Sequence, residues 1–149
     1  CVDRVNGFLD GLGDSKDKFK IVAQQDGGAA LDKSMELAED IITASPDMDA
    51  FFCINDPSAL GAAAAIKAAN KTGKIGVYSI DASPDGKQAL LDGEFTAVAC
   101  QVPVQIADYS FKEAVKYVNG DTKIDEKKVY LDSHLVSKDE AEKTLKEWQ

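Results

Sequence analysis

The sequence holds few of the residues on which enzyme and metal sites are most often built. It has one histidine, His134, and three cysteines among its 149 residues. No pair of cysteines is spaced Cys-x-x-Cys, and no Cys/His spacing is typical of zinc. Without a nucleophile and base motif, the sequence predicts a protein that is not an enzyme, with no catalytic residues, no cofactor and no metal. Cys53 and Cys100 lie in apolar runs and are predicted to be buried, and His134 is predicted to be a surface or strand-edge residue.

Long apolar runs and basic clusters are missing as well. No stretch approaches the roughly 18 to 20 apolar residues of a membrane helix. The 17 Lys and Arg against 26 Asp and Glu give a net charge of −9, without a basic stripe, so nucleic acid is not an expected partner. The apolar fraction of 44%, with 11 Gly and 4 Pro, is ordinary for a globular domain.

The order of apolar periods predicts strands and helices that alternate along the chain. Strands are expected over residues 19–23, 50–54, 75–80 and 96–100, with a last extended stretch over 128–136. Helices are expected in the opening segment and over residues 31–44, 57–69, 84–91, 104–118 and from 138 onward, with Ser137 as the last N-cap. Strands and helices in this order, joined by short connections, favour an α/β fold with a parallel sheet covered by helices on both faces.

Polar side chains follow three consecutive predicted strands. Asn55 and Asp56 come after the second strand, Asp81 after the third and Gln101 after the fourth. The carboxyl ends of parallel strands lie at one edge of the sheet, where ligands of open α/β folds bind. A planar amide or carboxylate holds two hydrogen bonds in one plane, as vicinal sugar hydroxyls require. Each residue also fits ordinary turn chemistry, and Asp56 before Pro57 is predicted to be a helix N-cap.

Two other α/β functions are disfavoured by the loops. Gly27 and Gly28 follow the first predicted strand without the spacing or the lysine of a phosphate-binding loop, so nucleotide binding is not expected. A response-regulator phosphoacceptor domain has the same fold class and nearly the same length. It needs a pair of acids after the first strand and a lysine after the last, where this chain has Gln24, Gln25 and Gln101.

Several motifs resemble one known family. They are Arg4-Val5-Asn6-Gly7-Phe8, Asn55-Asp56 with Ala59-Leu60-Gly61-Ala62, Ile80-Asp81-Ala82-Ser83-Pro84-Asp85-Gly86, and Ala99-Cys100-Gln101-Val102-Pro103 with Gln105-Ile106. In this order they resemble the C-terminal half of periplasmic sugar-binding proteins of the ribose-binding type, which are the extracytoplasmic receptors of ABC transporters. The resemblance implies a type I periplasmic-binding-protein fold, with a three-layer αβα lobe. It also implies that Arg4, Asn55, Asp81 and Gln101 bind a monosaccharide or polyol.

The resemblance further implies how the chain is divided. Residues 1–103 would form the C-terminal lobe of a two-lobed receptor without its first strand, residues 104–127 a crossover helix of the N-terminal lobe, and residues 128–149 a return strand and C-terminal helix. Cys1 is interpreted as a cut end inside a longer protein. The implied partners are a sugar, the N-terminal lobe and an ABC permease. An isolated segment is expected to pair with a companion fragment or a second copy.

The ligand and the setting are left more open than the family. Ribose binders of this family carry aromatic rings at the positions of Ala29 and Ile80, so ribose is not predicted here. The expected location is extracytoplasmic, either the periplasm or a lipid anchor at the outer face of the membrane. The alternative is the sugar-effector domain of a LacI-type transcriptional regulator, which the sequence upstream of Cys1 would distinguish by a helix-turn-helix instead of a signal peptide.

Overall fold

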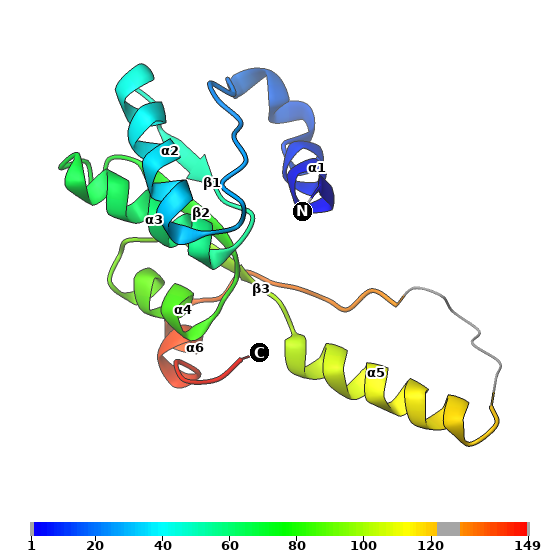
Figure 1. Ribbon diagram of the computed structural model, residues 1–149. Coiled ribbons are helices and arrows are strands. Elements are labelled where there is room, and N and C mark those ends of the chain that lie inside the picture. Colours follow the sequence, from blue (N-terminus) through cyan, green and yellow to red (C-terminus); the bar gives the residue numbers. More distant parts are fainter. Residues whose placement is uncertain (1, 122–128, 149) are drawn as a thin grey trace.

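A parallel three-stranded sheet forms the centre of the protein. The structure is a computed structural model that describes residues 2–121 and 129–148 (Figure 1). Strands β1 (Ala50–Phe52), β2 (Gly76–Asp81) and β3 (Ala97–Cys100) lie in the order β1-β2-β3. Both pairings are parallel, and the register sets Phe52 opposite Tyr78 and Asp81 opposite Cys100. The predicted α/β class is therefore confirmed.

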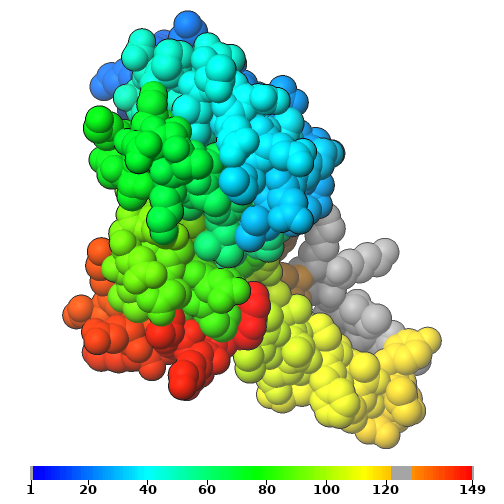
Figure 2. All heavy atoms as spheres, turned by 60° about the vertical axis from the view of Figure 1, so that its left-hand side comes forward, coloured from blue at the N-terminus to red at the C-terminus, as the bar shows by residue number. Residues whose placement is uncertain are grey.

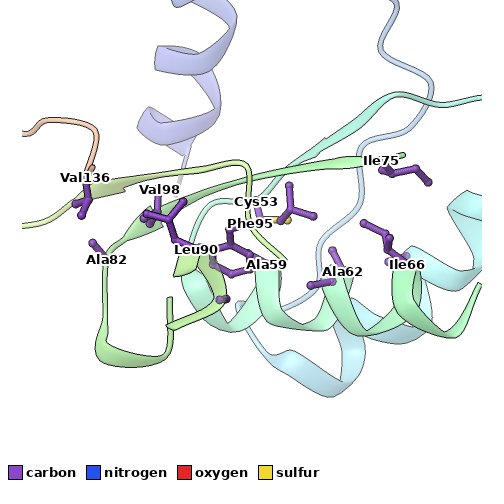
Figure 3. Packing of buried hydrophobic residues seen from close by; sticks show 14 of the residues in the cluster. Cys53, Ala59, Ala62, Ile66, Ile75, Ala82, Leu90, Phe95, Val98 and Val136 are labelled. Atoms are coloured by element: carbon purple, nitrogen blue, oxygen red, sulfur yellow. The ribbon is translucent and has the colours of Figure 1, made fainter. Parts of the chain in front are cut away.

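Helices cover both faces of the sheet, which gives three layers. In chain order they are α1 (Val2–Gly11), the short 3-10 helix η1 (Gly13–Lys18), α2 (Leu31–Ala44), α3 (Asp56–Ala68), α4 (Pro84–Leu91), α5 (Pro103–Val118) and α6 (Lys138–Lys143). Helices α3 and α4 pack on one face, with α2 against α3 and α6 against α4. Helix α1 lies across the opposite face (Figures 1 and 3).

The core lies between the sheet and α3. Val77 and Val98 of the two longer strands belong to the buried hydrophobic cluster and are 1% and 0% exposed. Figure 3 shows Val98 among the other residues of this cluster. The side of α3 that meets them is made largely of alanine, which brings the helix close to the strands. Cys53 and Cys100 are buried free thiols in this core, as predicted.

Helices α2 and α3 also approach each other closely, and Gly61 makes this possible. A Cβ atom at Gly61 would lie 2.4 Å from the carbonyl oxygen of Leu31 and 2.9 Å from the amide nitrogen of Met35. These are backbone atoms that cannot rotate away. The contact therefore depends on glycine at this position.

The strand predicted over residues 19–23 is wrong. This segment is extended but pairs with no strand among the described residues. Phe19 and Ile21 remain 57% and 53% exposed. The apolar pattern was sufficient to predict an extended chain, but a strand also needs a neighbouring strand to pair with its N–H and C=O groups. Among the described residues, β1 pairs with β2 and not with residues 19–23.

The return segment before α6 runs antiparallel beside β3. Cys100 N donates to His134 O at 2.9 Å, and Val136 N donates to Val98 O at 2.9 Å. The predicted return strand is reduced to a single bridge between Ala99 and Leu135, and residues 122–128 lie outside the described part. Ser137 caps α6 as predicted, because its side chain accepts from Glu140 N. His134 is at the strand edge, as expected.

Helix α5 projects from the rest of the protein (Figures 1 and 2). None of its residues is buried, although it is amphipathic and carries Phe111 and Val118, which are 71% and 82% exposed. No helix among residues 2–121 and 129–148 is both long and apolar enough to cross a membrane.

Candidate ligand-binding site

Three of the four predicted site residues meet at the carboxyl ends of the strands. Asp81 ends β2, and its Oδ1 accepts a hydrogen bond from Gln101 Nε2 at 2.7 Å. The guanidinium of Arg4 lies 3.1 Å from the same oxygen, measured from Nη1. Arg4, Asp81 and Gln101 form what we call the polar cluster.

Helix α1 brings Arg4 to this edge of the sheet. The ring of Phe8, one turn further along α1, stacks on Phe52 of β1, with ring centroids 4.4 Å apart and an interplanar angle of 13°. Arg4 Nη1 also donates to the carbonyl oxygen of Ile54, just beyond β1. One guanidinium thus links the exits of β1 and β2.

Asn55 is adjacent in sequence to Ile54, which contacts Arg4, and it also caps a helix. It is the N-cap of α3, because its Oδ1 accepts from Ser58 N at 3.2 Å. Its Nδ2 donates to the carbonyl oxygen of Ala29 at 3.2 Å. The prediction that Asp56 is this cap is wrong. Either of two adjacent polar residues can satisfy the free amides of a helix start, and here Asp56 is already the first helical residue.

The side chain of Asp56 points under the site. It is 1% exposed, and its Oδ1 accepts from Ser79 Oγ at 2.6 Å. Its backbone N donates to Asp81 Oδ2 at 3.4 Å. The sequence analysis named Asp56 as a polar residue at a strand exit and as a helix cap, but it did not predict that the side chain would be buried. The available signal was that Asn55 beside it could serve as the cap equally well.

The electrostatics of the site centre on Asp81. Burial raises the pKa of its carboxyl group above the ordinary 3.8, and the positive charge of Arg4 opposes this rise. The backbone of Asp81 has φ 134°, and the next residue, Ala82, has φ 54°. Two consecutive residues with side chains thus occupy backbone conformations that normally favour glycine, at the point where the polar cluster forms.

A cavity of about 630 Å³ lies between the polar cluster and α5. Arg4, Ile80 and Gln101 line it on the sheet side, and Ile106 and Tyr109 of α5 line it on the other. The segment around Tyr130 completes the wall, whereas Asn55 and Asp81 do not line it. Across the described ranges, no group of three or more Cys, His, Asp or Glu is arranged to hold a metal ion.

Comparison with known families agrees with this fold. A family model described as a periplasmic binding protein domain matches residues 1–122. The chain belongs to this family.

Named relatives include sugar import proteins. The ribose import binding protein of Salmonella typhimurium is 33% identical over 119 residues, which are 80% of this chain and 39% of that protein. The D-apiose import binding protein of Actinobacillus succinogenes is 31% identical over 144 residues, 96% of this chain and 46% of that protein. The chain thus spans less than half the length of these relatives.

Solved structures give the same result. A galactofuranose binding protein is 32% identical with a TM-score of 0.88, and the match covers 97% of this chain and 49% of that one. A Caulobacter myo-inositol binding protein, solved with myo-inositol, is 28% identical with a TM-score of 0.87 over 95% of this chain and 48% of the other. The type I periplasmic-binding-protein fold predicted from the motifs is confirmed.

Proposed function

We propose that this chain is the C-terminal half of an extracytoplasmic solute-binding protein, which binds a monosaccharide or related polyol and delivers it to an ABC permease. The observation that carries the proposal is the polar cluster at the carboxyl ends of parallel strands. The relatives named for ribose and apiose import support transport over the effector domain of a regulator.

The polar cluster leaves hydrogen-bonding capacity for a ligand. A guanidinium has five N–H donors, and among the described residues the contacts of Arg4 are made through Nη1. Gln101 uses its amide nitrogen toward Asp81, which leaves its carbonyl oxygen to accept from a hydroxyl. A sugar hydroxyl both donates and accepts, so it suits a site where guanidinium donors stand beside carboxylate and amide acceptors.

The lining of the cavity bears on the kind of sugar. Ile80 lies on the sheet side where ribose binders of the family carry an aromatic ring, and it offers a smaller apolar surface. Tyr109 and Tyr130 line the opposite side of the same cavity. A ligand that extends from the polar cluster into this cavity would therefore stack against the side away from the sheet, and ribose is not favoured.

A second lobe would cover the apolar side chains that are exposed in this chain. We assign residues 1–103 to the C-terminal lobe, 104–127 to a crossover helix packed in the N-terminal lobe, and 128–149 to the return strand and last helix. The exposed face of α5 supports the crossover assignment. In this assignment a further strand of the whole protein would fit between β1 and residues 19–23, where β1 has no partner among the described residues and Phe19 is exposed.

We propose a binding role without catalysis. Cys100 Sγ lies 3.3 Å from His134 Nδ1, and His134 Nε2 lies 2.9 Å from Glu140 Oε1, an order that resembles a thiol nucleophile with its base. Cys100 is only 1% exposed, however, and buried cysteines of this kind are usually structural. The arrangement is better explained as a link between β3, the return segment and α6.

The test is calorimetry on the protein with both lobes, against D-ribose, D-allose, D-apiose, D-fucose, L-arabinose and myo-inositol. For the sugar that binds most tightly, Asp81→Ala or Asn55→Ala should weaken binding by about 2 kcal/mol or more, because a buried hydroxyl loses its partner. Asp40→Ala, on the exposed side of α2, is the control and should leave the affinity unchanged. Unchanged affinity in both site variants would remove these residues from the site, and no binding of any sugar would refute the proposed ligand class.

A further inference from the structure

The carboxylate of Asp56 is tied to both ends of the segment that carries Asp81. Its Oδ1 accepts from Ser79 Oγ at 2.6 Å, two residues before Asp81. Its Oδ2 accepts from Ser83 N at 2.7 Å and from Ser83 Oγ at 2.6 Å, two residues after Asp81. Asp56 is 1% exposed, so these short hydrogen bonds take the place of the water molecules that would otherwise solvate its carboxylate.

The segment between these bonds has an unfavourable backbone conformation. Asp81 and Ala82 have φ of 134° and 54°, and neither is glycine. Such conformations cost free energy and persist only where the surroundings hold them. The side chain of Ala82 is 0% exposed, so the turn is also packed on its inner side.

Helix α4 closes over the same carboxylate. A Cβ atom at Gly86 would lie 2.1 Å from Asp56 Oδ2, so only glycine fits at this position of α4. Ser83, which bonds Asp56, is also the N-cap of α4 through Gly86 N. The carboxylate is therefore enclosed by α3, β2 and the start of α4.

We propose that Asp56 is a positioning residue of the ligand site: its carboxylate holds residues 79–83 in the conformation that directs the Asp81 carboxylate toward Arg4 and Gln101. The backbone N of Asp56 adds a direct bond to Asp81 Oδ2. The effect on ligand affinity rests on the proposed function, whereas the effect on the backbone of Asp81 and Ala82 does not.

The decisive variant is Asp56→Asn, which keeps the shape of the side chain. An amide has one oxygen, so if that oxygen stays toward Ser83, the NH₂ group faces Ser79 Oγ, which must then accept instead of donate. The bonds from Ser83 also lose the negative charge that strengthens them. We expect residues 81 and 82 to relax and the affinity for the sugar selected by the calorimetric panel to fall about tenfold or more. Adding Ala82→Gly, which allows positive φ without strain, should recover more than half of this loss on a logarithmic scale.

A purely structural role for Asp56 predicts another pattern. In that case Asp56→Asn would have a lower melting temperature, but the folded protein would bind the sugar with unchanged affinity. Alternatively, the affinity would fall and adding Ala82→Gly would not restore it. Either result would overturn the proposal. Thr96→Val is the matched control, since it removes the acceptor of Val77 N at the far end of β2 and should reduce stability without changing affinity.

A measurement without ligand separates this proposal from the proposed function. In the chain of 149 residues, the three-bond HN–Hα coupling of Ala82 and the hydrogen exchange of the Ser83 amide should both change in Asp56→Asn. If that variant does not fold, Ser79→Ala removes one bond to the carboxylate and should produce smaller changes of the same sign. Unchanged values in the variant that folds would refute the positioning role even if sugar binds, and changed values would support it even if no sugar in the panel binds.

Discussion

Replacing Lys87 by Met should loosen the attachment of the C-terminal helix. Lys87 lies in α4 and is 0% exposed. Its Nζ donates to the carbonyl oxygens of Thr144 at 2.8 Å and Glu147 at 2.7 Å, at and just beyond the end of α6. Met has a similar length and keeps the apolar packing of the stem, so the substitution removes mainly the ammonium group and its two bonds.

The expected magnitude follows from two opposing effects. Each hydrogen bond from a charged donor contributes about 1.5 to 3 kcal/mol to stability. Part of this stabilisation is offset in the parent protein, because the buried ammonium group loses its hydration on folding. Met at this position carries no charge and does not have that cost. Glu147 is exposed, so its carbonyl oxygen regains water. We therefore expect the free energy of unfolding to fall by about 1 to 2 kcal/mol, which is less than the roughly 3 to 6 kcal/mol that two such bonds would give without these opposing effects.

Urea unfolding measures this change, and hydrogen exchange shows where it falls. Amides of α6 should exchange faster in Lys87→Met, while those of α3 should exchange at nearly the same rate. Lys67→Met is the control: its ion pair with Glu94 lies at the surface, so its loss should cost less than about 0.5 kcal/mol. A Lys87→Met protein as stable as the parent would show that the cost of burying the ammonium equals the gain from its two bonds.

The same residue predicts a dependence on pH. Burial lowers the pKa of Lys87 below its ordinary 10.5, against the opposing charges of Glu140 and Glu147. The unfolded chain therefore binds more protons than the folded one between this lowered pKa and 10.5, and stability rises with pH across that interval. Since Lys87→Met lacks this group, the stability of the parent relative to the variant should increase there. A difference that stays constant with pH would contradict the argument.

Two further predictions concern the site and the packing. Because burial raises the pKa of Asp81 above 3.8, sugar affinity should decline as the pH falls toward that raised pKa. Calorimetry from pH 7 downward measures this decline, which should be absent in Asp81→Asn. Gly61→Ala places a methyl group against the backbone of Leu31 and should lower the free energy of unfolding by about 2 kcal/mol or more, whereas Gly7→Ala in α1, which meets no atom within 4 Å, should raise it by about 0.5 to 1 kcal/mol in the same urea titration.

Local patterns predicted most of the elements because their causes are local. The helix expected over residues 84–91 forms with those bounds, since Ser83 caps it and Pro84 suits its first position. The predicted strands over 50–54, 75–80 and 96–100 form as β1, β2 and β3 with small shifts at their ends. The predicted strand over 19–23 fails because pairing depends on a neighbouring strand, which the local sequence does not specify.

The site was predicted in its composition but not in its geometry. Arg4, Asp81 and Gln101 could be named because the carboxyl ends of parallel strands lie together. The positive φ of Asp81 and the inward direction of Asp56 could not be named. The direction of Asp56 involves bonds to Ser79 and Ser83, which are distant from it in the sequence, so the Asn55-Asp56 pair alone does not specify it.

The bonds within the polar cluster imply that the site is arranged before a ligand arrives. Asp81 Oδ1 accepts from Gln101 while lying beside Arg4, and Oδ2 accepts from the backbone of Asp56. A carboxylate oxygen can accept more than one hydrogen bond, so a hydroxyl can donate to Asp81 without displacing these partners. In the two-lobed protein that we propose, binding would then require little reorganisation around the polar cluster, and its main conformational cost would lie in bringing the second lobe over the cavity beside α5. Affinity in such a protein depends on how readily the two lobes close as much as on the hydrogen bonds that either lobe provides.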